Sequence, residues 1–203
     1  MPDTHVVFLL SPANCAGKRA GYLLRPNGGS ELAQRLRSGA GATLGEVFTF
    51  MSGLYFRGKL AYATAFADAP PDCAGIHVIV PGLGLSTPDA VIDLARLQAM
   101  ARVPVDPDDR RYVEPLRRDA ARLADRLRPT DTVVLLGSIA TPKYLQPLTD
   151  VLGTRLRVPE EFIGRGDMSR GALMLRRAAE RRALTYVAVA PPPTVELARP
   201  RST

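Results

Sequence analysis

The sequence predicts an α/β fold, specifically a three-layer α/β/α sandwich around a mainly parallel sheet of four or five strands. Short apolar runs rich in β-branched residues alternate along the chain with longer segments of helical periodicity. The first three apolar runs are unbroken, which is typical of strands covered on both faces. The helical segments between them are long enough for the right-handed crossovers that join parallel strands.

The strands are expected where these apolar runs occur. The first three lie at residues 5–11 (HVVFLLS), 75–82 (GIHVIVPG) and 131–138 (DTVVLLGS). A fourth is expected at 154–162, and 184–190 is a candidate for a fifth. Because helical segments separate the first three runs from one another, we expect these strands to be parallel.

Capping residues and prolines indicate where the helices begin. Thr43 and Glu46 have the spacing of a capping box and open a helical run that continues, with a glycine interruption, to residue 67. Thr87 and Thr141 each precede a proline, which predicts an N-cap followed by proline at the first helical position. A further helix is expected to begin near Pro115.

Length and composition indicate one globular domain. The chain has 203 residues, of which 46% are hydrophobic and 23% charged, enough for one well-buried core but few for two. We expect this domain to span 1–190 and the Pro-rich segment 191–203 to form a tail. No apolar segment approaches the roughly 20 residues of a membrane span, so we expect no membrane partner and a cytoplasmic location. The sequence leaves the oligomeric state open.

The chain is basic, with 27 Lys and Arg against 20 Asp and Glu and a formal net charge of +7. This excess favours a nucleotide, a nucleic acid or another phosphorylated partner. The alternative is that the cations are solvated, because many arginines lie in helical stretches. The only two cysteines, Cys15 and Cys73, form neither a disulfide framework nor a zinc motif. We expect no metal and no cofactor.

Polar, glycine-bearing segments follow the predicted strands. They are SPANCAGKR (11–19), PGLGLSTPD (81–89), GSIATPK (137–143) and GRGDMSRG (164–171). The carboxyl ends of parallel strands lie at one edge of a sheet, where open α/β folds bind their ligands. Three of the segments lead into helix N-termini, which favour anions. The sequence therefore predicts one site at this edge for a phosphate, a carboxylate or a nucleic-acid backbone.

Several residue types at this edge are suited to holding such a ligand. In the first segment, Ser11, Asn14, Lys18 and Arg19 are expected to hold the polar or anionic end. This segment is not a Walker A loop, because Arg19 stands where that motif needs Ser or Thr. The other ligand-binding candidates are Gly82, Gly137, Ser138, Lys143, Tyr144, Arg165, Ser169 and Arg170, together with Tyr55 and Arg57.

A helical face within 54–67 carries unusual polar residues. Tyr55, Lys59 and Tyr62 are spaced i, i+4 and i+7 and therefore share one face of the helix. One interpretation is that this face projects toward the carboxyl edge of the sheet. The other is amphipathic packing, with the cation and the hydroxyls reaching water.

The candidate catalytic residues are few. Asp89 and Asp167 stand at expected helix starts and are the carboxylates best placed for proton transfer or water activation. Ser169 is an alternative cap for the last helix. Cys15 precedes two cations near a helix start, a setting that lowers the pKa of a thiol, and is the alternative as a nucleophile. Glu46 is explained by its capping box.

The order of these segments resembles a family of uncharacterised small α/β domains of bacteria and phages. The matching pieces are SPANCAGK, GLYFRGKLAYA, GLGLSTPD and GSIATPKYLQPL, which extend over much of residues 5–150. The piece VVLLGSIA also resembles a strand and helix start of the uracil-DNA-glycosylase-like superfamily. That resemblance implies a parallel-sheet sandwich with a base pocket near Gly137, Ser138 and Ala140. The water-activating and His-Pro-Ser-type loops of those glycosylases are not matched, which puts uracil excision in doubt.

Together these features predict a protein that binds a nucleobase, nucleotide or nucleic-acid end and acts on it at a glycosidic or phosphate-linked centre. Ser138 and Tyr144 would line the pocket, and Arg165, Asp167 and Arg170 would close it. One alternative is an enzyme of a small carboxylated or phosphorylated metabolite that uses the same site. A second is a non-catalytic protein whose basic surface docks on nucleic acid or on an acidic protein.

Overall fold

The protein is a mixed α/β chain in a computed structural model that describes residues 4–139 and 141–189. Its main sheet has six strands in the order β4-β3-β1-β6-β7-β8. The four central strands are parallel, whereas both edge strands are antiparallel to their neighbours. The strand bounds are β1 (Val6–Leu10), β3 (Ile76–Val80), β4 (Gly84–Ser86), β6 (Thr132–Leu136), β7 (Leu156–Pro159) and β8 (Tyr186–Ala188).

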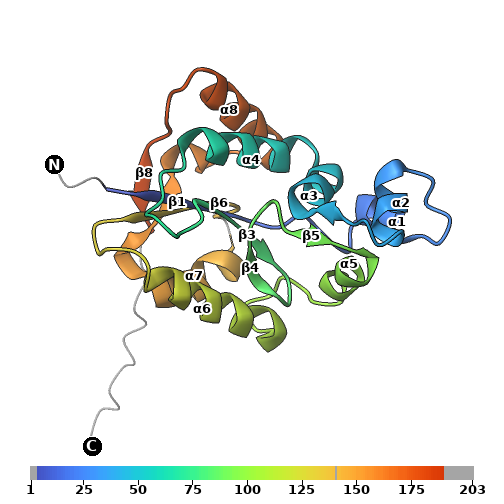
Figure 1. Ribbon diagram of the computed structural model, residues 1–203. Coiled ribbons are helices and arrows are strands. Elements are labelled where there is room, and N and C mark those ends of the chain that lie inside the picture. The colour runs from blue at the N-terminus through green and yellow to red at the C-terminus, as the bar shows by residue number, and fades with distance from the viewer. Residues whose placement is uncertain (1–3, 140, 190–203) are drawn as a thin grey trace, which may run out of the picture.

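Helices cover both faces of this sheet (Figure 1). On one face α4 and α8 pack against Phe8 and Leu10 of β1, and on the other α6 and α7 pack against Val7 and Leu9. Successive side chains of a strand point to opposite faces of the sheet, and both faces of β1 are apolar because helices cover each of them. The helix bounds are α1 (Lys18–Leu24), α2 (Glu31–Arg37), α3 (Leu44–Ser52), α4 (Leu54–Phe66), α5 (Leu94–Ala101), α6 (Arg110–Ala124), α7 (Pro142–Leu152) and α8 (Asp167–Ala179), with short 3-10 helices at Gly153–Arg155 and Glu160–Phe162.

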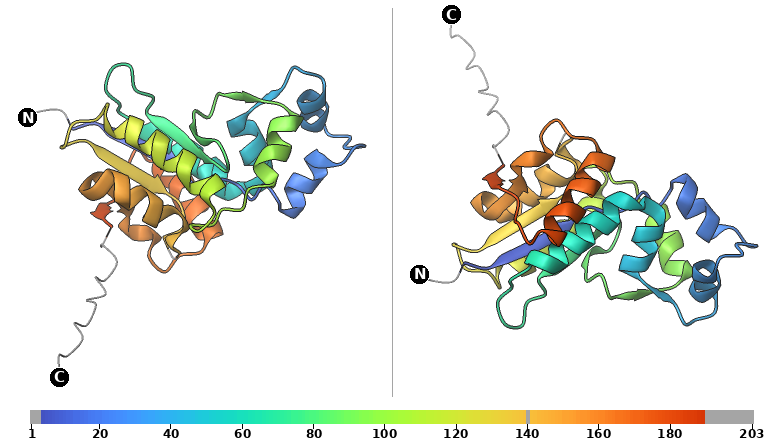
Figure 2. Two further views of the ribbon diagram at one scale, coloured as in Figure 1. Left: turned by 90° about the horizontal axis from the view of Figure 1, so that it is seen from below. Right: turned by 90° about the horizontal axis from the view of Figure 1, so that it is seen from above.

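A group of smaller elements lies beyond the carboxyl end of β1. Figure 2 shows α1, α2 and α5 together on that side of the molecule. With them is a two-stranded antiparallel sheet of β2 (Ala42–Thr43) and β5 (Val91–Ile92). The capping box at Thr43 and Glu46 is confirmed and opens α3 directly after β2. These elements extend the fold past the carboxyl edge of the main sheet.

The structure confirms the mixed α/β class and corrects the sheet. The expected strands are all present, but the sheet has six strands rather than four or five. The additional strand is β4, which hydrogen-bonds to β3 through the register Val80↔Gly84. It is three residues long and begins with a glycine, so it lacks the apolar run of a buried strand. The expected tail at 191–203 lies outside the described residues.

Three expected helix starts are also corrected. Thr87 does not cap a helix, because 84–92 forms β4, a turn and β5, and α5 instead begins after Asp93, whose side chain accepts from the backbone N–H of Arg96 at 2.8 Å. The helix expected near Pro115 begins earlier, at Arg110, after an Asp109 cap. The last helix is capped by neither Asp167 nor Ser169, since its N-cap is Gly166.

Helices α4 and α8 touch backbone to backbone at Gly58 and Gly171. A Cβ placed on Gly58 would lie 2.5 Å from the carbonyl oxygen of Gly171. A Cβ on Gly171 would lie 2.9 Å from the carbonyl oxygen of Leu54. Only glycine fits this crossing without a shift of one helix. The contact sets the first turn of α8 beside the first turns of α4, where Tyr55 and Lys59 lie.

Candidate functional site

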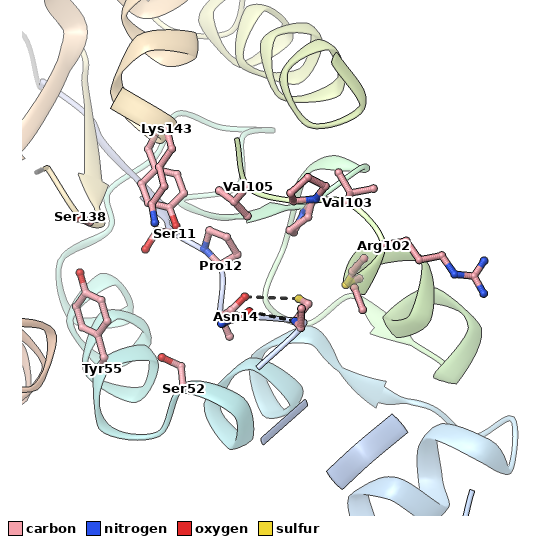
Figure 3. A pocket seen from close by; sticks show the side chains of 18 of the residues that line it. Ser11, Pro12, Asn14, Ser52, Tyr55, Arg102, Val103, Val105, Ser138 and Lys143 are labelled. Carbon is pink, nitrogen blue, oxygen red and sulfur yellow. Dashed lines mark hydrogen bonds between the residues drawn. The ribbon is translucent and has the colours of Figure 1, made fainter. Parts of the chain in front are cut away.

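A cavity of about 560 Å³ opens at the carboxyl ends of β1, β3 and β6. Figure 3 shows Tyr55 and Ser52 on one side, Lys143 and Val105 on the other, and Ser11 and Pro12 between them. Its volume falls in the range of small-molecule sites. The lining residues are Ser11 to Ala16, Ser52, Tyr55, Pro81, Met100 to Val105, Ser138, Lys143, Tyr144 and Asp167.

The floor of the cavity is the loop that joins β1 to α1. The backbone N–H of Ser11 donates to the carbonyl of Leu136 at 3.1 Å, which continues the pairing of β1 with β6. The side-chain oxygen of Asn14 then accepts from the N–H of Ala16 at 3.1 Å, and the N–H of Gly17 donates to the Asn14 carbonyl at 3.1 Å. Asn14 is therefore largely occupied in shaping this turn.

Beneath Ser11 lies a lysine that was placed on the same helix face as Tyr55 but was not among the predicted ligand-binding residues. Lys59 of α4 is fully buried, and its Nζ donates to the Ser11 carbonyl at 2.6 Å and to Ser11 Oγ at 2.9 Å. Burial lowers the pKa of Lys59 to about 7, although the charge of Asp167 opposes the shift. Its Nζ also lies 4.4 Å from the centre of the Tyr55 ring.

Two tyrosines contribute hydroxyls to the cavity wall. The Tyr55 hydroxyl is buried, and no described residue offers it a hydrogen bond of good geometry. Burial raises the pKa of Tyr55 to about 12; the charge of Asp167 adds to the rise, while nearby Arg170 opposes it. Burial also raises the pKa of Tyr144, which the Ser11 hydroxyl partly offsets. Both phenols are therefore neutral donors at neutral pH.

Asp167 brings a carboxylate to the mouth of the cavity. It is the first residue of α8, its side chain is 63% exposed, and its Oδ1 lies 3.5 Å from the guanidinium of Arg170. Arg170 is buried and donates two hydrogen bonds to the carbonyl of Phe162, at 2.9 and 3.2 Å. Arg170 thus holds the start of α8 in place rather than facing the cavity, contrary to the predicted ligand-binding role.

The structure brings together about half of the predicted site residues and separates the others. Those that line the cavity are Ser11, Asn14, Cys15, Tyr55, Ser138, Lys143, Tyr144 and Asp167. Arg19 and Arg57 instead line a separate hollow, where Arg19 donates to the Phe50 carbonyl at 3.3 Å. Arg165 donates to Ser169 Oγ at 3.3 Å outside the cavity, and Lys18 lies on α1 outside the lining. Their expected place around the cavity is corrected.

Two further predicted residues have roles in the scaffold. Gly82 has a φ of +78°, and a Cβ there would lie 2.9 Å from Val103 Cγ2. A Cβ on Gly137 would lie 2.9 Å from the Cβ of Ser11. The first glycine therefore lets the 102–105 segment approach the cavity, and the second lets β6 end beside Ser11.

Cys15 and Asp89 do not have the surroundings expected of catalytic groups. Cys15 lines the cavity but is only 5% exposed, and burial raises the pKa of its thiol to about 12. The expected lowering of the thiol pKa is wrong, because burial raises it. Asp89 lies in the turn between β4 and β5, next to a different hollow at α3. Asp89 and Asp167 therefore do not line the same cavity.

The wall opposite the predicted loops contains none of the predicted site residues. It consists of residues 100–105, from the end of α5 into the following loop, and Figure 3 shows the side chain of Arg102 extending away from the other labelled residues. The loop at 102–111 stood out in the sequence only by its length, as a lid or a plain connection between helices. Its position depends on α5 lying beyond the sheet edge, which only the tertiary structure shows.

Comparison with known proteins adds no assignment. No family model matches this chain, and no curated protein and no solved structure matches it. Among the described residues, no group of three His, Cys, Asp or Glu side chains is arranged to hold a metal ion. None of the described helices combines the length and apolar character needed to cross a membrane. The resemblances drawn from short sequence motifs remain predictions, and Ala140 lies outside the described residues.

Proposed function

We propose that this protein binds a nucleobase, nucleotide or nucleic-acid end in the carboxyl-edge cavity and acts on it at a glycosidic or phosphate-linked centre. The observation that supports this most directly is the joint presence of Tyr55, Tyr144, Lys143 and Asp167 around one cavity of about 560 Å³. Such a volume accommodates a nucleoside with a phosphate group.

Each of these groups has a part in this proposal. The aromatic side chains of Tyr55 and Tyr144 offer a surface against which a base can stack. Lys143, in the first turn of α7, supplies a cation for a phosphate. Asp167 supplies a carboxylate for proton transfer or for orienting water. A mainly parallel sheet presents all four groups at its carboxyl edge, the usual place for such a site.

The arrangement of the cations favours a small ligand over a long polyanion. Lys18, Arg19, Arg57 and Arg165 do not line the cavity. Its lining contains Lys143 and Arg102, and the Arg102 side chain extends away from the other labelled residues (Figure 3), so the cations form no continuous basic track. The alternative of a small phosphorylated or carboxylated metabolite therefore uses the same residues. We also propose that the fold is a three-layer α/β/α sandwich and that the protein acts in the cytoplasm.

Binding of nucleoside monophosphates, nucleosides and free bases should be measured by calorimetry on the purified protein. We expect a nucleoside monophosphate to bind, and we expect Lys143→Ala to weaken it at least about tenfold while weakening the bare nucleoside much less. Lys18→Ala is the matched control, because that lysine lies outside the cavity, and it should leave affinity unchanged. If none of the three ligand classes binds tightly, the proposal is contradicted.

Activity tests the second half of the proposal. The same ligands should be incubated with the protein, and released base, nucleoside and phosphate separated by chromatography. Asp167→Asn should lower the release rate by at least about tenfold if this carboxylate handles a proton. Affinity that falls steeply with added salt, without any release of product, would instead support the non-catalytic docking alternative.

A further inference from the structure

We propose that Ser11 is a nucleophile and Lys59 its general base, for attack on the phosphorus of a phosphate ester bound in the cavity. This inference rests on the proposed function, because it names the reacting bond of the same site. It assigns a chemical role to a buried lysine that the ligand-binding residues described above do not use.

Ser11 lies between the buried lysine and the open cavity. Ser11 is one of the residues that line the cavity and is 3% exposed, and Lys59 Nζ stands 2.9 Å from its Oγ. The serine is fixed from two directions, since its N–H donates to the Leu136 carbonyl and its own carbonyl accepts from Lys59 at 2.6 Å. Gly137 adds no side chain that would cover it. Enzymes with a serine nucleophile hold the serine in the same way, with its hydroxyl hydrogen-bonded to a general base.

The surroundings of Lys59 favour its neutral form. The Nζ faces the rings of Tyr55 and Phe56, at 4.4 and 5.1 Å from their centres. No carboxylate of the described residues forms an ion pair with it, and Asp167 acts on it only as a more distant charge. The other titratable groups around this pair are Arg170 on α8, Tyr144 on α7 and Cys15 on the β1 to α1 loop.

A neutral Lys59 can donate to the Ser11 carbonyl and still accept a proton from Ser11 Oγ. A charged Lys59 donates to both oxygens, and loss of one proton leaves its Nζ a lone pair that can accept from Ser11 Oγ. Lysines of lowered pKa serve as general bases in several enzyme classes. The geometry therefore permits proton transfer between the two side chains without any movement of the backbone.

The reaction balances with these two groups, the Asp167 carboxylate and water. Ser11 Oγ attacks phosphorus and passes its proton to Lys59 Nζ while the bond from phosphorus to the leaving oxygen breaks. The leaving oxygen, on the far side of phosphorus from Ser11, takes up a proton from water at the open side of the cavity, and the phosphate remains esterified to Ser11. A water molecule then enters on that side, gives a proton to the Asp167 carboxylate and cleaves the phosphorus bond to Oγ. Lys59 returns its proton to Ser11 Oγ, Asp167 releases its proton to solvent, and inorganic phosphate or a phosphate monoester is released.

A fluorophosphonate probe tests the nucleophile without any knowledge of the substrate. Ser11 Oγ should displace fluoride from phosphorus, and mass spectrometry of the digested protein should find the adduct on the peptide that contains Ser11. Ser11→Ala should abolish this adduct. Ser52→Ala is the matched control, because Ser52 lines the same cavity with no lysine bonded to it, and should leave labelling of Ser11 unchanged. An adduct on another residue, or none, would overturn the inference.

The pH profile of labelling tests the base in the unmodified protein. The rate should rise about tenfold per pH unit below pH 7 and level off above it, as Lys59 loses its proton. Lys59→Met should abolish labelling if the variant folds. If it does not fold, the wild-type profile decides, and a rate that keeps rising through pH 9 would exclude Lys59 as the base.

Protection by ligand separates this inference from the proposed function. A nucleoside monophosphate added before the probe should slow labelling of Ser11 at least tenfold. If Ser11 is labelled but the nucleotide gives no protection, the assignment of Ser11 as nucleophile is supported and the proposal that the cavity binds a nucleotide is contradicted. Nucleotide binding by calorimetry with no labelling of Ser11 would keep the proposed function and overturn the serine mechanism.

Discussion

The buried amino group of Lys59 should make the stability of the fold depend on pH in a defined window. The side chain is 0% exposed, and burial lowers its pKa from 10.5 to about 7. Between these two pH values the unfolded chain binds a proton that the folded chain does not. The free energy of unfolding therefore rises with pH in this window, and below about pH 7 the contribution is constant because both states are protonated.

The size of the effect follows from these two pKa values. From pH 7 to pH 8.5 the free energy of unfolding should rise by about 1.5 kcal/mol. Higher pH is less informative, because Cys15 has an ordinary pKa of 9.0 when unfolded and about 12 in the fold. Above pH 9 the unfolded chain loses a proton that the folded chain keeps, which lowers stability and opposes the lysine.

Urea unfolding at pH 7, 7.5, 8 and 8.5, at constant ionic strength, measures this rise. Lys59→Met keeps the side-chain volume but removes the titrating group, so its unfolding free energy should lack the rise. Lys143→Met is the control for loss of a lysine from the same cavity, and should keep it. A wild-type free energy that is flat or falls over this range, or a rise that persists in Lys59→Met, would refute the reasoning.

Three other predictions concern packing and reactivity. Gly58→Ala should lower the free energy of unfolding by about 1–3 kcal/mol, because its Cβ would lie 2.5 Å from the Gly171 carbonyl; a neutral effect in urea unfolding would contradict the close crossing. In the folded protein, Cys15 should react with a thiol reagent at least about tenfold more slowly than Cys73, as followed by peptide mass, because it is more buried; faster labelling of Cys15 would mean that its loop opens. Tyr62→Phe should cost about 1–3 kcal/mol in the same unfolding assay, because a buried backbone N–H would lose its acceptor at 2.7 Å, and an unchanged midpoint would refute this.

The parts of the fold that local sequence specifies were predicted, and the parts that depend on neighbours were not. The runs that became β1, β3 and β6 are apolar on both faces, so their pattern alone predicts buried parallel strands. Strand β4 carries no such pattern. It forms because the chain turns back at Gly82 and pairs antiparallel with β3. The start of α6 was placed too late, since the prediction followed the proline at Pro115 and left the acidic cap at Asp109 out of account.

The same distinction applies to the site. Ser11, Ser138 and Asp167 were found because each follows a predicted strand, and strand ends converge at one edge. Lys59 was grouped with Tyr55 on one helix face, but its burial depends on α8 and on the β1 to α1 loop, both distant in sequence. The predicted anchors Lys18 and Arg165 were assigned by charge and segment alone. Which way a side chain points from a loop is not specified by that pattern.

The close crossing of α4 and α8 also determines at which stage of chain synthesis the cavity can form. Asp167 and the start of α8 reach the cavity only when the last described helix has docked on α4. The order of synthesis delays this step, because Tyr62 receives its hydrogen bond from Leu184, 122 positions further along the chain. A nascent chain on the ribosome can thus pair β1 with β3 long before it completes the cavity. Ligand binding should accordingly appear late during synthesis, after α8 has left the exit tunnel, and would report complete folding rather than the first collapse of the sheet.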